Sequence, residues 1–103
     1  MTRILLVEDE PTLRTVVSQV LERAGYLVQA VGTVREAVAN RGPWNLLLLD
    51  RRLPNGDGLA VARTFPGVPV LTVSGQEDAD LRKPFTLDEL KSAVADRLAS
   101  ARL

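Results

Sequence analysis

The sequence contains no cysteine and no histidine among its 103 residues. The lack of cysteine excludes disulfide frameworks, thiolate zinc sites, iron–sulfur clusters and cysteine nucleophiles. The lack of histidine excludes Ser-His-Asp triads, histidine metal sites and histidine proton shuttles. The chemistry open to this chain is therefore that of carboxylates, hydroxyls, lysine and arginine.

The sequence also lacks an excess of either charge and any long apolar run. Its 13 basic residues balance its 13 acidic residues, so it has no overall basic field for binding nucleic acid. The N-terminal apolar run, residues 4–7, is too short for the core of a signal peptide or for a membrane span. We therefore expect a cytoplasmic protein that binds neither nucleic acid nor a membrane.

Length and composition are those of one small folded domain. A chain of 103 residues with 46% hydrophobic and 25% charged residues is long enough to bury a single core without covalent staples. We expect one domain over residues 1–103.

Short apolar runs alternate with segments whose apolar residues recur at helical spacing. Strands are predicted at residues 4–7, 26–31, 46–50 and 68–73. Helices are predicted at residues 11–24, 34–40 and 59–65, and from residue 87 onward. This alternation predicts an α/β fold with a parallel sheet.

Local signals set the helix boundaries and the buried faces. Pro11 suits the first turn of a helix, and capping boxes at residues 33–36 and 86–89 begin two others. The last helix is expected to bury a face made of Leu87, Leu90, Val94 and Leu98.

Polar side chains follow the carboxyl ends of the predicted strands. Glu8 and Asp9 follow the first strand, Asp50 ends the third, Ser74 follows the fourth, and Lys83 precedes the last helix. Ligands of open parallel sheets bind at this edge. Carboxylates, a hydroxyl and an ammonium are the groups of a Mg²⁺-assisted phosphoryl site, in which a carboxylate can itself be the nucleophile.

Four motifs in this order make the chain resemble a response regulator receiver domain of the chemotaxis-regulator type over nearly its whole length. They are the acidic cluster at 7–10, the Asp-to-Gly loop at 50–58, Ser74-Gly75, and Lys83-Pro84-Phe85. The resemblance implies a flavodoxin-like three-layer sandwich with a five-stranded parallel sheet in the order 2-1-3-4-5. It also implies a cis peptide bond between Lys83 and Pro84.

The resemblance assigns a role to each site residue. Asp50 would accept a phosphoryl group from a histidine kinase or phosphotransfer protein, and Ser74 and Lys83 would bind that group. Mg²⁺ would be held by Asp9, Asp50, the backbone carbonyl of Arg52 and, through water, Glu8. The chain has no histidine, so its phosphohistidine donor must be a partner, or a small molecule must donate the group. It would signal by protein contact and catalyse only its own phosphorylation and dephosphorylation.

The chain departs from the family between Ser74 and Lys83, where only eight residues replace a helix and a strand. If residues 80–82 form a fifth strand, the remaining five residues span at most roughly 17 Å, which suffices for an extended return but not for a helix. We therefore expect a short fifth strand and no fourth helix.

A second departure is Asp80, which stands where the family has its switch aromatic.

Without the fourth helix, we expect an apolar face of the fourth strand, near Val70 or Leu71, to be left partly uncovered and available for a homodimer.

Alternative interpretations remain open at this point. The acidic residues 8–10 could serve the first turn of a helix, Asp50 could be a helix-capping or loop residue, Ser74 could be a turn hydroxyl, and Lys83 could be solvated. The domain could be a degenerate receiver that acts only as an interaction or dimerisation module. An aspartate-nucleophile phosphatase ranks last, because Arg52 stands where such enzymes have a second aspartate.

Overall fold

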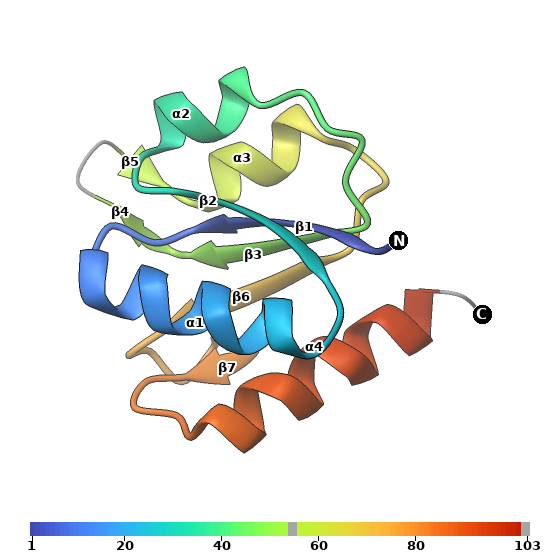
Figure 1. The fold of residues 1–103 in the computed structure, drawn as a ribbon. Helices are drawn as coiled ribbons and strands as arrows, with labels where there is room; N and C mark the ends of the chain where they lie inside the picture. Colours follow the sequence, from blue (N-terminus) through green and yellow to red (C-terminus); the bar gives the residue numbers. More distant parts are fainter. Residues whose placement is uncertain (54–55, 102–103) are drawn as a thin grey trace.

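The computed structural model describes residues 1–53 and 56–101 and has three layers. A central sheet is covered by α2 and α3 on one face and by α1 and α4 on the other (Figure 1). The strands are β1 (Arg3–Val7), β2 (Leu27–Val31), β3 (Leu46–Asp50), β4 (Arg52–Leu53), β5 (Gly56–Asp57), β6 (Val70–Ser74) and β7 (Leu81–Arg82). The helices are α1 (Pro11–Arg23), α2 (Val34–Ala39), α3 (Leu59–Thr64) and α4 (Leu87–Ala101). In this part of the chain no helix is both long and apolar enough to cross a membrane.

The main sheet is parallel and runs in the order β2-β1-β3-β6-β7. Counted along the chain, its five strands have the predicted order 2-1-3-4-5. The register pairs Val7 with Leu49 and Asp50 with Val73. The carboxyl ends of β1, β3 and β6 therefore meet at one edge of the sheet.

A small antiparallel hairpin of β4 and β5 lies outside the main sheet. The sequence predicted only a loop within residues 50–58, and residues 54 and 55 lie outside the described residues. Two-residue strands carry too little periodic signal to be predicted from the sequence.

The sheet separates two hydrophobic cores. Ile4, Leu6, Leu46 and Leu48 face α1 and α4, while the residues that alternate with them face α2 and α3. Side chains of a strand point alternately to its two faces, so a strand covered on both sides must be apolar throughout. This is why β1 is apolar from Ile4 to Val7 and β3 from Leu46 to Leu49, with Glu8 and Asp50 as the next residues.

The predicted buried face of the last helix is correct except at its start. Leu90, Val94 and Leu98 are buried, but Leu87 is 43% exposed. Leu87 is the first residue of α4 and borders a shallow hollow beside Val20 of α1. Helical spacing identifies the face, but only the tertiary structure decides where along that face the contact with the sheet begins.

The predicted loss of the fourth helix is confirmed. The described residues 75–80 between β6 and β7 form bends and a single turn, in which the Ala79 N–H donates to the Gln76 carbonyl. β7 is only two residues long and pairs with Val73 and Ser74. The return to the last strand is therefore short and non-helical.

The expected uncovered apolar face does not extend to Leu71. Leu71 is 4% exposed because it faces the core beneath α1 and α4, the helices that this chain retains. Val70 faces the other core and is partly buried. A homodimer through this region stays a prediction, and Leu71 is not part of its surface.

Asp80 fastens the short crossover to the edge of β6. Its Oδ2 accepts from the Thr72 backbone N–H at 2.9 Å and from the Thr72 hydroxyl at 3.1 Å. The Asp80 N–H in turn donates to Thr72 Oγ1 at 3.0 Å. These bonds satisfy an N–H of β6 that the two-residue β7 is too short to pair.

We predict that Asp80→Ala lowers the free energy of unfolding by about 1–3 kcal/mol, because it leaves the buried Thr72 amide without a partner. Asp80→Asn should lose less, since its amide oxygen can still accept. Urea unfolding measures both. Asp78→Ala is the control, because its exposed ion pair with Arg51 contributes about 0–1 kcal/mol. Equal losses for Asp78→Ala and Asp80→Ala would contradict the role of Asp80.

Candidate functional site

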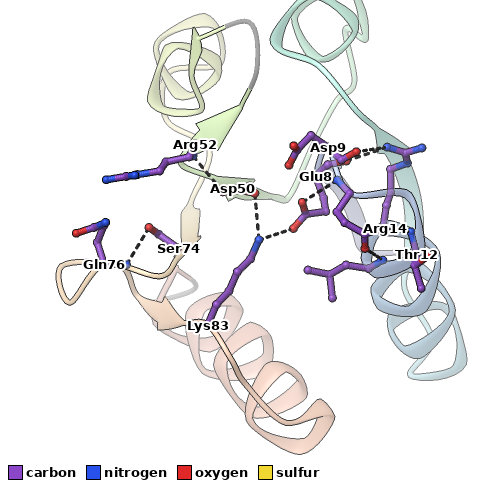
Figure 2. A network of polar contacts seen from close by, with 11 residues as sticks. Glu8, Asp9, Thr12, Arg14, Asp50, Arg52, Ser74, Gln76 and Lys83 are labelled. Atoms are coloured by element: carbon purple, nitrogen blue, oxygen red, sulfur yellow. Dashed lines mark hydrogen bonds and ion pairs between the residues drawn. The ribbon is translucent and has the colours of Figure 1, made fainter.

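The acidic residues after β1 divide into a site pair and a helix cap. The Glu8 N–H donates to the Val31 carbonyl at 3.0 Å, which continues the sheet pairing and leaves Glu8 only 4% exposed. Glu10 is the N-cap of α1, and its carboxylate accepts from the N–H groups of Thr12 and Leu13. These hydrogen bonds, that from Leu13 first, lower the pKa of Glu10. The helix-start interpretation thus holds for Glu10, while Glu8 and Asp9 turn toward Asp50 (Figure 2).

Asp50 ends β3 with its carboxylate at the sheet edge and is 6% exposed. Its Oδ1 accepts from the Arg52 N–H at 3.0 Å. Gly58 closes the loop that follows, with its N–H donating to the Arg51 carbonyl at 3.2 Å. A Cβ atom on Gly58 would overlap the Asp50 carbonyl oxygen, so the loop can return this closely only with glycine there.

Lys83 joins the two buried carboxylates. Its Nζ lies 3.0 Å from Glu8 Oε1 and 3.1 Å from Asp50 Oδ2 (Figure 2). The Lys83 N–H donates to the Ser74 carbonyl at 2.8 Å, which extends the pairing of β6 and β7. The predicted cis bond between Lys83 and Pro84 is present. The lysine is therefore placed by the sheet and reaches the site from the far side of β6.

Burial and ion pairing shift the ionisation of this group in opposite directions. Burial raises the pKa of the Glu8 carboxyl, although hydrogen bonds from the Glu10 N–H and Lys83 lower it in part. Burial lowers the pKa of Lys83, but its hydrogen bonds and attraction to Glu8 and Asp50 outweigh burial and raise it overall. Lys83 therefore stays protonated at neutral pH.

Three carboxylates converge where a cation could bind. Oxygens of Glu8, Asp9 and Asp50 all lie within 4.8 Å of one another. When ionised, they carry three negative charges against the single positive charge of Lys83. Hard oxygen donors with surplus negative charge are the donor set that Mg²⁺ prefers, so the residues present fit this ion.

Ser74 lies on β6, beside Asp50, and is 2% exposed. Its Oγ accepts from the Gln76 N–H at 3.1 Å (Figure 2), and within the described residues it makes no hydrogen bond to Asp50. The Arg52 side chain extends toward the Ser74 side of the site, away from Asp9. Ser74 and Arg52 both border an open hollow of about 740 Å³. The structure thus brings Glu8, Asp9, Asp50 and Lys83 together, with Ser74 one strand away.

Sequence reasoning missed Arg14. Its Nη1 donates to the Glu8 carbonyl at 2.9 Å, with the Asp9 carbonyl at 3.5 Å (Figure 2). Its place in the first turn of α1, after the acidic cluster, could have suggested this contact. Such arginines are usually solvated, however, and the contact depends on how the helix leaves the loop.

Known proteins share this sequence pattern. The profile of the response regulator receiver domain matches residues 4–85. The chain is 36% identical to the transcriptional regulatory protein TcrA of Mycobacterium tuberculosis, over 85% of this chain and 42% of TcrA. It is 32% identical to HprR of Escherichia coli, over 93% of this chain and 51% of HprR. The chain therefore spans about half or less of the length of these relatives.

Solved structures share the fold. A CheY-like receiver domain protein of Methanospirillum hungatei superimposes with a TM-score of 0.89 at 26% identity, covering 99% of this chain and 97% of that one. TrrA of Thermotoga maritima, solved in complex with Mg²⁺-BeF, superimposes with a TM-score of 0.82 at 28% identity, covering 94% of this chain and 99% of TrrA. This chain belongs to the response regulator receiver domain family, in a short form without the helix that the family has between the strands corresponding to β6 and β7.

Proposed function

We propose that this receiver domain is phosphorylated on Asp50 in a Mg²⁺-dependent reaction and signals by protein contact in a two-component system. The observation that carries the proposal is the Lys83 ammonium between the buried carboxylates of Glu8 and Asp50, with Asp9 alongside. In the transfer, an Asp50 carboxylate oxygen forms a bond to phosphorus, and the bond from phosphorus to the donor's leaving group breaks.

Mg²⁺ would be held by the Asp9 and Asp50 carboxylates, the Arg52 carbonyl and, through water, Glu8. When bound, it neutralises charge on the transferring phosphoryl group and on the carboxylates around it. TrrA, the relative solved with Mg²⁺-BeF, supports magnesium in this role.

Lys83 and Ser74 would receive the phosphoryl group. The Lys83 ammonium already contacts Asp50 Oδ2, so it can pair with an oxygen of a phosphoryl group placed on Asp50. The Ser74 oxygen accepts from Gln76, and the hydroxyl proton is still available to donate. Ser74 is therefore assigned to a phosphoryl oxygen that extends toward β6.

The phosphodonor would be a phosphohistidine on a histidine kinase or phosphotransfer protein, because the chain contains no histidine of its own. Its catalysis would be limited to its own phosphorylation and dephosphorylation. The downstream target, a single domain over residues 1–103 and a cytoplasmic location stay predictions.

The alternative of a degenerate receiver is not favoured. Each residue type that the chemistry requires is present, and Glu8, Asp9, Asp50 and Lys83 meet at one point. A module that served only contact would have no need to keep Glu8 and Asp50 buried with one ammonium between them. A phosphatase is less compatible, because Arg52 occupies the position of that class's second aspartate.

We predict that incubation with a small-molecule phosphodonor and Mg²⁺ adds one phosphoryl group to the protein, seen by intact mass spectrometry. Asp50→Asn should abolish the adduct. Lys83→Ala should slow its formation about 10²-fold or more, as expected for loss of one charge-stabilising group. The control is Asp57→Asn, since Asp57 is exposed and, among the residues that the structure describes, its carboxylate accepts from the Leu59 N–H and does not contact Asp50 or Lys83. An adduct of equal yield on Asp50→Asn would overturn the assignment.

A second prediction concerns the effect of the buried Glu8 charge on stability. Folding raises the pKa of Glu8 above its ordinary value of 4.5, so the folded state favours the neutral carboxyl. The contribution of Glu8 to the free energy of unfolding is therefore greatest below pH 4.5, and it is lost as the pH rises through the raised pKa. Without Mg²⁺ at neutral pH, Glu8→Gln should therefore have a free energy of unfolding about 1 kcal/mol greater than that of the unsubstituted protein, measured by urea unfolding. The gain should shrink as pH falls toward 4.5.

The same variant should bind Mg²⁺ about tenfold more weakly by calorimetry, because it loses an outer carboxylate of the ion. Glu22→Gln, an exposed glutamate of α1, is the matched control and should change neither quantity. A Glu8→Gln protein that is less stable than the unsubstituted protein at neutral pH would show that the Lys83 ion pair outweighs the burial of Glu8.

A further inference from the structure

Arg14 lies against the loop that carries Glu8 and Asp9, on the side away from Asp50 (Figure 2). Its guanidinium donates from Nη1 to the Glu8 carbonyl at 2.9 Å and reaches the Asp9 carbonyl at 3.5 Å. Figure 2 shows the side chain rising from α1 to the backbone of this loop. The contact joins the first turn of the helix to the two residues whose carboxylates face Asp50.

The loop between β1 and α1 has only three residues, and each is tied to a neighbour. Glu8 is tied to β2 through its N–H and the Val31 carbonyl, and Glu10 caps α1. The Glu10 N–H donates to Glu8 Oε2 at 3.1 Å. Asp9 is exposed, and within the described residues its carbonyl accepts one long hydrogen bond, from Arg14.

Gly32 provides the space that Arg14 occupies. A Cβ atom at position 32 would lie 2.8 Å from Arg14 Nη1, closer than such atoms approach. Gly32 is not among the glycines with a positive φ, so its backbone conformation does not require glycine. A side chain at position 32 would therefore displace the guanidinium, whereas glycine leaves room for it.

We propose that Arg14, seated over Gly32, is a positioning residue for the Mg²⁺ site. It holds the carbonyls of Glu8 and Asp9 on the side of the loop away from Asp50, so that both carboxylates point toward Asp50. It acts through Glu8 and Asp9 and touches neither the ion nor the phosphoryl group. This inference rests on the proposed function, because it concerns the same Mg²⁺ site.

A role as a nearby charge and a role in positioning predict opposite changes in Mg²⁺ affinity when Arg14 is replaced. Measuring that affinity therefore separates the two roles. If Arg14 acted only as a nearby cation, its removal would lessen repulsion and tighten Mg²⁺ binding. If it positions the ligands, its removal weakens binding, as loss of an outer support of a metal site does by about 10–100-fold. Arg14→Lys keeps the charge but not the planar guanidinium, so it should rescue affinity only in part.

The experiment measures Mg²⁺ affinity by calorimetry for the full chain and for Arg14→Gln, Arg14→Lys, Gly32→Ala and the Arg14→Gln/Gly32→Ala double variant. Arg14→Gln should weaken binding at least tenfold. Gly32→Ala should weaken it too, because the new methyl group displaces the guanidinium without removing its charge. The double variant should lose no more than Arg14→Gln alone, because both changes break one contact. Arg23→Gln, on the same helix, controls for the lost charge and should bind normally.

A second measurement, of amide hydrogen exchange, is made without Mg²⁺. Amide hydrogen exchange of Glu10, whose N–H donates to Glu8 Oε2, should be faster in Arg14→Gln and Gly32→Ala and unchanged in Arg23→Gln. Binding by Arg14→Gln that is unchanged or tighter, or Glu10 exchange that is unchanged, overturns the proposal. If Arg14→Gln fails to fold, Gly32→Ala decides by the same two measurements. An unsubstituted protein that binds no Mg²⁺ would instead overturn the proposed function itself.

Discussion

The structure depends on one charge arrangement, in which the Lys83 ammonium stands between two buried carboxylates. Glu8 directly follows β1 and Asp50 ends β3, two adjacent inner strands of the sheet, and both residues are buried, so solvent stabilises their charges little. Burying charge without a partner is costly, so the Lys83 ammonium must lie within hydrogen-bond distance of both carboxylates. The pairing of β7 with β6 and the hydrogen bond from the Lys83 N–H to the Ser74 carbonyl place it there.

The shortened crossover changes how such a site can communicate with the surface. Asp80, in the place of the switch aromatic, is engaged with Thr72 and closes the edge of β6. At this position the chain therefore has no aromatic ring of the kind that the family uses as a switch. The segment that bears Gln76 and Asp78 instead lies directly beside the site and is tied to Ser74 and Arg51. A short loop, residues 75–80, and not a helix, therefore borders the Ser74 side of the site.

Elements with strong local signals were predictable, and elements that depend on distant partners were not. The leucine run of β3, the Thr33 capping box and the missing helix follow from periodicity, side-chain geometry and chain length. The hairpin β4–β5, the burial of Leu71 and the exposure of Leu87 were not foreseen, because each depends on what another element covers. The candidate site residues could be chosen from the sequence because the carboxyl ends of parallel strands meet at one edge of a sheet, and because four motifs resemble those of the receiver family.

The sequence by itself determined the alternation of strands and helices, the chemistry left to carboxylates, hydroxyl and ammonium, and the residues at the strand ends. These are properties of single segments, read from their order along the chain. Only the tertiary structure decided that Glu10 caps a helix while Glu8 is buried in the site, and that Arg14 donates to the Glu8 carbonyl. It also decided that Asp80 bonds Thr72. Those choices depend on distances between backbone and side-chain atoms that are set only when helices pack on the sheet.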